Sequence, residues 1–97
     1  MSASITRVVF DVLKPRELDS IELARSLCEL NGVESVNLIV REVDVRTETI
    51  RLVVEGPNID IDDVLERLDE IGCAVRSIDS VVAKRQELGE QSKERGT

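Results

Sequence analysis

The 97-residue chain contains no histidine, no tryptophan and no tyrosine, and Phe10 is its single aromatic residue. The lack of histidine excludes the usual general base near neutral pH, the commonest zinc ligand and every catalytic triad built on imidazole. The lack of aromatic side chains excludes RNA binding by base stacking on a small sheet. A net charge of −7 also opposes contact with phosphate backbones. We therefore expect neither catalytic activity nor a nucleic-acid partner.

Long hydrophobic runs and cysteine motifs are also missing. No apolar segment approaches the ~20 residues that cross a bilayer, and the N-terminal MSASITR lacks the hydrophobic centre of a signal peptide. Cys28 and Cys73 belong to no CxxC motif, and we expect both to be buried or half-buried structural thiols. These absences predict an acidic, cytoplasmic protein with no membrane partner.

The apolar residues, mostly valine, isoleucine and leucine, follow the same order twice along the chain. In the first half, a strand over Ile5–Leu13 leads through Pro15 into a helical pattern. In the second half, a strand over Thr49–Glu55 leads through Gly56 and Pro57 into another helical pattern. Each half then ends with one more apolar strand. The sequence therefore predicts two consecutive β-α-β units.

Both predicted helices carry start and stop signals. Asp19 and Asp60 are suited to cap their N-termini, while Asn31-Gly32 and Gly72 are suited to end them. Between these signals, apolar residues recur at helical spacing: Ile21, Ala24, Leu27 and Cys28 in the first helix, and Ile61, Val64, Leu65, Leu68 and Ile71 in the second.

The β-α-β-β-α-β order predicts an α+β fold of the ferredoxin-like sandwich type, a four-stranded antiparallel sheet with two helices on one face. Right-handed crossovers place the first and third strands in the centre of the sheet. We expect a single domain over residues 1–83, with a polar, mobile C-terminal tail over residues 84–97. In the last strand, Cys73–Ala83, Val75 and Ile78 can share a face only if a bulge intervenes, which leaves the direction of Asp79 open.

The face of the sheet away from the helices is predicted to be bare. Alternation along the strands places on it five apolar side chains, Val9, Leu13, Ile39, Val43 and Val53, with Asn37, Arg41, Thr49 and Arg51 filling the gaps. An apolar patch of this size favours burial against another protein surface. We therefore expect the protein to form a homo-oligomer.

Asp11 lies in the middle of the first strand and belongs to the same bare face. Three interpretations stay open: a strand charge that faces water, an ion pair with Arg41 or Arg51 at a subunit contact, or a ligand of a divalent cation such as calcium. The cation hypothesis draws on four carboxylates, Asp11, Asp44, Glu48 and Asp79, whose spacing matches no closed metal-binding motif. No other cofactor is expected.

Three segments, FDVLKP, VNLIVREVDVRTETIRLVVEG and IGCAVRSIDSVVA, resemble the archaeal family known as domain of unknown function 211 over about residues 5–84. The resemblance implies a small ferredoxin-like protein that forms homo-oligomers, and it is compatible with a bound divalent cation. The matching positions are Asp11, Lys14, Pro15, Asn37, Asp44, Glu48, Ser77, Ile78 and Asp79. This chain departs from the family pattern where Arg16 and Arg76 replace a common histidine and where Cys73 replaces a glycine, so no role that needs imidazole applies here.

Two functions of different classes remain as expectations. The first is a non-catalytic, self-assembling module, with a structural divalent cation as one variant. The alternative is a small-molecule-sensing regulatory module of the amino-acid-binding type, which shares the same order of elements. Such modules often carry glycine in the first strand–helix loop, and residues 14–20 contain none.

Overall fold

The computed structural model describes residues 3–85. Its elements follow the predicted order: β1 (Ala3–Pro15), α1 (Ser20–Cys28), β2 (Ser35–Val43), β3 (Thr47–Glu55), α2 (Ile61–Glu70) and β4 (Ala74–Arg85). The strands form one antiparallel sheet in the order β2-β3-β1-β4, which confirms that β1 and β3 are central. β4 continues to Arg85, two residues beyond its predicted end at Ala83. The rest of the predicted tail, residues 86–97, lies outside the described residues.

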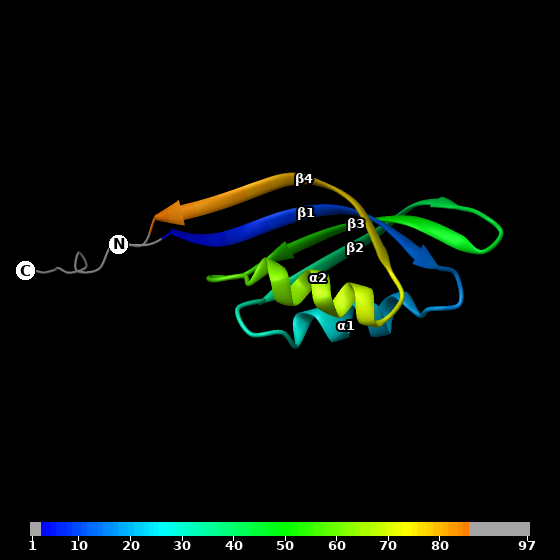
Figure 1. Ribbon diagram of the computed structural model, residues 1–97, viewed down its shortest axis with the longest axis horizontal. Helices are drawn as coiled ribbons and strands as arrows, with labels where there is room; N and C mark the ends of the chain where they lie inside the picture. The colour runs from blue at the N-terminus through cyan, green and yellow to red at the C-terminus, as the bar shows by residue number, and fades with distance from the viewer. Residues whose placement is uncertain (1–2, 86–97) are drawn as a thin grey trace, which may run out of the picture.

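Both helices pack on the same face of the sheet, and the hydrophobic core lies between the two layers (Figure 1). Every second residue of β1 points into this core, because side chains alternate along a strand. Val8, Phe10 and Val12 are each fully buried there. The helices contribute one apolar stripe each, through Leu23, Leu27, Val64 and Leu68. Burial of one such side chain contributes about 1.5–3 kcal/mol to the stability of the fold. The alternating pattern that predicted the α+β sandwich therefore also supplies the core that stabilises it.

The N-termini of both helices are capped as predicted. The Asp19 side chain accepts a hydrogen bond from the Ile21 N–H at 2.8 Å, and the Asp60 side chain accepts one from the Asp63 N–H at 3.2 Å. Each aspartate thereby satisfies a backbone donor that has no partner within its helix.

Glycine ends each helical segment where the chain must turn back to the sheet. Gly72 follows α2 with a φ of 92°, a conformation that favours glycine. α1 ends earlier than predicted, at Cys28, and the chain then turns through Gly32, which has a φ of 86°. A Cβ atom at Gly32 would lie 1.9 Å from the Asn58 carbonyl oxygen, so glycine also permits the loops before β2 and α2 to approach one another.

The pairing of β4 with β1 shifts register at three places: Thr6 is an extra residue in β1, and two β-bulges add one extra residue each to β4. Val75 pairs with Val12 and Ser77 pairs with Asp11, so Arg76 is an extra residue in β4. This bulge confirms that Val75 and Ile78 require an irregularity between them.

The second bulge of β4 follows three residues later. Ile78 pairs with Phe10 and Ser80 pairs with Val9, which leaves Asp79 as the extra residue. Its side chain lies on the same side of β4 as that of Ser77, since the two are joined by a hydrogen bond.

Another bulge lies in β2, on the opposite edge of the sheet. Val40 pairs with Ile50 and Glu42 pairs with Thr49, so Arg41 is the extra residue. No glycine marks this position in the sequence. Beyond the bulge the alternation of β2 is shifted by one residue.

Lys14 is buried at the end of β1, with 1% of its side chain exposed. Its ammonium group forms an ion pair with the Glu48 carboxylate at 3.1 Å and donates hydrogen bonds to the carbonyl groups of Pro15 and Leu18. A lysine ammonium has three donors, and these three partners satisfy all of them. Lys14 therefore joins β1, β3 and the connection to α1 from inside the fold.

Replacing Lys14 with methionine keeps most of the apolar packing but removes these three contacts. We expect the free energy of unfolding to fall by about 2–4 kcal/mol, because the Glu48 carboxylate and two carbonyl groups lose their donor. Urea unfolding followed by circular dichroism measures this loss. The control Arg25→Met removes an ion pair whose side chains are 71% and 64% exposed, and should change the free energy by less than about 0.5 kcal/mol. Equal losses in both variants would contradict the role of Lys14.

Candidate functional site

The face of the sheet opposite the helices is uncovered within residues 3–85 (Figure 1). We call it the open face. Its central rows are set by the pairing of β1 with β3, in which Val9 lies opposite Val53, Asp11 opposite Arg51, and Leu13 opposite Thr49. Directly paired residues of antiparallel strands present their side chains on the same face. Asp11 therefore lies on the open face, as predicted.

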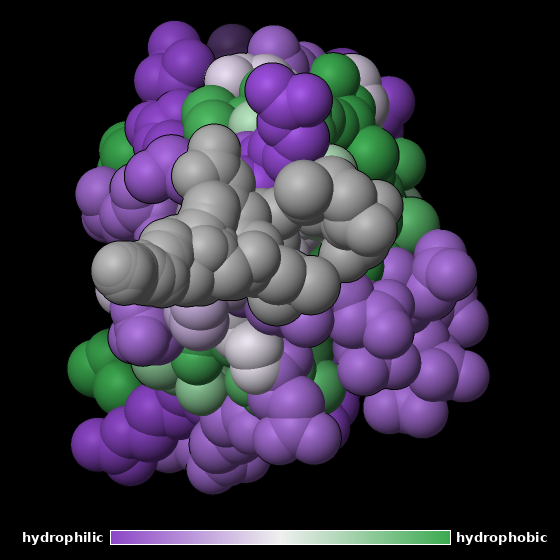
Figure 2. All heavy atoms as spheres, turned by 90° about the vertical axis from the view of Figure 1, so that its left-hand side faces the viewer, coloured by the Kyte–Doolittle hydropathy of each residue, from purple (hydrophilic) through white to green (hydrophobic). Residues whose placement is uncertain are grey.

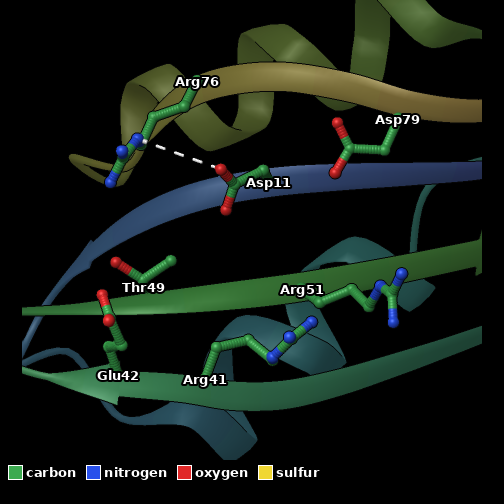
Figure 3. Close-up of a pocket in the computed structure, with 7 residues that line it drawn as sticks. All are labelled: Asp11, Arg41, Glu42, Thr49, Arg51, Arg76 and Asp79. Carbon is green, nitrogen blue, oxygen red and sulfur yellow. Dashed lines mark ion pairs between the residues drawn. The ribbon is translucent and has the colours of Figure 1, made fainter.

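A hollow of about 450 Å³ surrounds Asp11 on the open face (Figure 3). All four strands contribute to its lining, which consists of Asp11, Arg41, Glu42, Thr49, Arg51, Arg76 and Asp79. Three guanidinium groups and three carboxylates thus meet in one shallow site. We call it the charged hollow.

The bulges of β2 and β4 contribute to the charged hollow. Arg41, Arg76 and Asp79, the extra residues of β2 and β4, all line it. A bulge sets two consecutive residues of one strand opposite a single residue of its partner. Each bulge therefore adds one residue to the edge strand beside the open face, and these extra residues carry charged side chains near Asp11.

The charges of the hollow are only partly paired. The Asp11 Oδ2 atom lies 3.9 Å from the Arg76 Nε atom, and the Asp79 carboxylate accepts a hydrogen bond from the Ser77 hydroxyl at 2.7 Å. The guanidinium groups of Arg41 and Arg51 form no ion pair or hydrogen bond with any other residue of the described part of the chain. Two arginines of the hollow thus form no ion pair among the residues that the structure describes.

Arg76 is the partner of Asp11 that sequence reasoning missed, since Arg41 and Arg51 were the expected partners. Arg76 lies beside Asp11 because it is the extra residue of β4 between Val75, which pairs with Val12, and Ser77, which pairs with Asp11. The spacing of Val75 and Ile78 gave a signal for the bulge but not for the position of the extra residue.

The structure brings together two of the four predicted metal ligands. Asp11 and Asp79 line the charged hollow, whereas Asp44 lies in the turn between β2 and β3, where it accepts a hydrogen bond from the Val45 N–H at 2.8 Å. Glu48 is paired with Lys14 and is not part of the hollow. Among residues 3–85, no group of three or more acidic or cysteine side chains could hold a metal ion. Cation binding therefore stays a prediction.

The predicted apolar residues of the bare face differ in exposure. Val9, Ile39 and Val53 border a groove of about 400 Å³ that continues from the charged hollow. Ile39 is 38% exposed, but Val9 is buried among its neighbours on the sheet. Leu13 and Val43 border another hollow near the turn between β2 and β3.

The bulge in β2 shifts Val43 out of the alternation that placed it on the bare face. Because Arg41 is an extra residue, Glu42 rather than Arg41 pairs with Thr49, and Val43 pairs with Glu48 rather than with Thr47. Val43 is nonetheless 60% exposed at the end of β2.

β4 adds exposed apolar side chains that sequence reasoning did not assign to any surface. Ile78, Val81 and Val82 are 45%, 50% and 38% exposed. Val82 pairs with Arg7, a residue of the groove, and so lies on the open face. Figure 2 shows hydrophobic side chains in the upper part of the molecule, the side along which β4 runs in Figure 1, and a second group at the lower left.

The two cysteines differ from one another and from the prediction. Cys73 is buried as expected, but Cys28 is exposed, because the buried side of α1 passes through Leu23 and Leu27 instead. Burial raises the pKa of the Cys73 thiol, and the positive charge of Lys14 acts in the opposite direction. A raised pKa makes a thiol less nucleophilic. Neither cysteine lines the charged hollow.

This difference predicts two classes of thiol reactivity. With Ellman's reagent at mildly alkaline pH, we expect one thiol per folded chain to react rapidly and the second to react only after unfolding. The Cys28→Ser variant should lose the rapid phase, because the raised pKa and burial of Cys73 both suppress its thiolate. Two rapid thiols in the wild-type chain, or a rapid phase that survives in Cys28→Ser, would contradict the assignment.

The fold and the open face together define a small ferredoxin-like α+β protein with one uncovered sheet face. No helix in the described range is long and apolar enough to span a membrane. The chain belongs to the family DUF211, described as uncharacterized ArCR, whose model matches residues 6–96. It is similar to the uncharacterized protein MJ0319 of Methanocaldococcus jannaschii, with 37% identity over 86 residues that cover 89% of each chain. The predicted family membership is therefore confirmed.

Proposed function

We propose that this protein is a non-catalytic module that assembles with copies of itself through the open face of its sheet. The observation that carries the proposal is the uncovered face itself, on which apolar side chains stay accessible beside the groove. Ile39 and Val82 are each 38% exposed there, and Leu13 and Val53 are only half-buried. Contact with a second open face would remove this apolar surface from water.

The charge of the open face also supports self-association. The chain carries a net charge of −7, so two copies repel one another over most of their surface. In the charged hollow, three arginines balance three carboxylates. The contact between two open faces therefore avoids the like-charge repulsion that other faces would meet. A two-fold axis through this face would give the isologous contact that is commonest in homo-oligomers.

The absence of catalysis in this proposal rests on the chemistry of the side chains. The chain has no histidine to act as a general base at neutral pH. The buried thiol of Cys73 has a raised pKa, which is opposite to the activation that a nucleophile needs.

The substitution Ile39→Asp tests the open face. We expect self-association to weaken at least about tenfold, because the variant removes apolar contact area and places a charge in the interface. Sedimentation velocity over a range of protein concentrations measures the change. Ile39 is partly exposed, so the variant should fold.

The matched control is Ile21→Asp, which introduces the same change on α1, where Ile21 is 64% exposed. This control should leave the mass of the assembly unchanged. Equal dissociation of both variants would show that added negative charge, and not the open face, controls assembly. A wild-type chain that stays monomeric at high concentration would also contradict the proposal.

A further inference from the structure

The open face around the charged hollow lacks the excess of acidic residues that the chain as a whole carries. Four arginines and three carboxylates line the hollow and its adjoining groove: Arg7, Arg41, Arg51 and Arg76 against Asp11, Glu42 and Asp79. The whole chain, in contrast, has 20 acidic and 13 basic residues. Guanidinium groups in a concave surface that is free of the general negative charge of the protein attract small anions.

Two of these arginines already have acidic partners within the chain. Arg76 lies 3.9 Å from Asp11, and Arg7 lies 3.5 Å from Glu55. Arg41 and Arg51 form no such pair within residues 3–85. Two guanidinium groups that lie in one hollow and form no ion pair with its carboxylates repel one another, and an anion between them would relieve this repulsion.

The backbone holds these two arginines on adjacent strands. Arg51 lies in the regular ladder of β3, opposite Asp11, while Arg41 reaches the hollow from the bulge of β2. Figure 3 shows both side chains extending in the same direction along the sheet. Guanidinium groups are planar donors that bind carboxylate or phosphate oxygens in pairs. The volume of about 450 Å³ is in the range of sites for small metabolites.

We propose that the charged hollow binds a small organic anion, whose carboxylate or phosphate group lies between the guanidinium groups of Arg41 and Arg51. The Asp11–Arg76 pair forms the opposite wall and holds Asp11 away from the anion. This inference goes beyond self-association and does not rest on it, since the groove with Val9, Ile39 and Val53 continues away from the hollow along the same face. It gives the uncovered sheet a ligand-binding role as well.

Isothermal titration calorimetry with the full chain tests this site, with pyrophosphate and citrate as separate titrants at a low ionic strength of about 20 mM. We expect saturable binding of at least one of the two anions. Tighter binding of pyrophosphate would assign the site to phosphate groups, and tighter binding of citrate would assign it to carboxylates. The Arg41→Gln and Arg51→Gln variants should each bind at least about tenfold more weakly, because each loses one guanidinium fork.

The matched control is Arg25→Gln, which removes the same charge from an exposed position on α1. It should bind the anion like the wild-type chain, and urea unfolding should show that all three variants are folded. The absence of saturable binding up to about 10 mM of either anion, which corresponds to less than about 3 kcal/mol, would overturn the site. Equal weakening in Arg25→Gln and Arg51→Gln would also overturn it, because it would show attraction by net charge alone. Sedimentation of the same samples reports self-association separately, so the two proposals can fail independently.

Discussion

A four-stranded sheet has two faces, and both helices of this chain pack against one of them. This constraint divides the residues of β1 between two environments. Val8, Phe10 and Val12 enter the core, whereas Val9, Asp11 and Leu13 remain on the open face. The stability of the fold comes from the first set. Any contact with a partner or a ligand through the sheet must use the second set, so the function that we propose follows from the face that the helices leave uncovered.

The bulges explain how a sheet with a regular core carries an irregular charged surface. Asp11 lies in a central strand, where a carboxylate without a partner would be unfavourable. The extra residues of β2 and β4 bring Arg41, Arg76 and Asp79 around it without changing the register of β1 with β3. One of these arginines pairs with Asp11. The other lies in the same hollow as Arg51, and neither of these two guanidinium groups forms an ion pair within the described residues.

Most of the fold could be predicted from the sequence because its signals are local. Alternation gave the strands, and Asp19 and Asp60 marked the helix starts, since capping involves residues only two or three positions apart. The charged hollow could be predicted only in part. Its residues come from four strands and lie together only in the observed pairing register. The sequence of a single strand does not specify that register. The bulge at Arg41 had no marker, and the burial of Lys14 against Glu48 was unexpected, because lysine is almost never fully buried without a partner.

The central claim is that the open face brings copies of this chain together through apolar contact. Native mass spectrometry of the wild-type chain, first with calcium and then after chelation, tests this claim most directly. Our account predicts one defined oligomer whose mass and abundance do not change when calcium is removed. A monomer under both conditions would contradict the claim. An oligomer that loses ions and dissociates on chelation would show instead that carboxylates such as Asp11 and Asp79 assemble the protein through a cation.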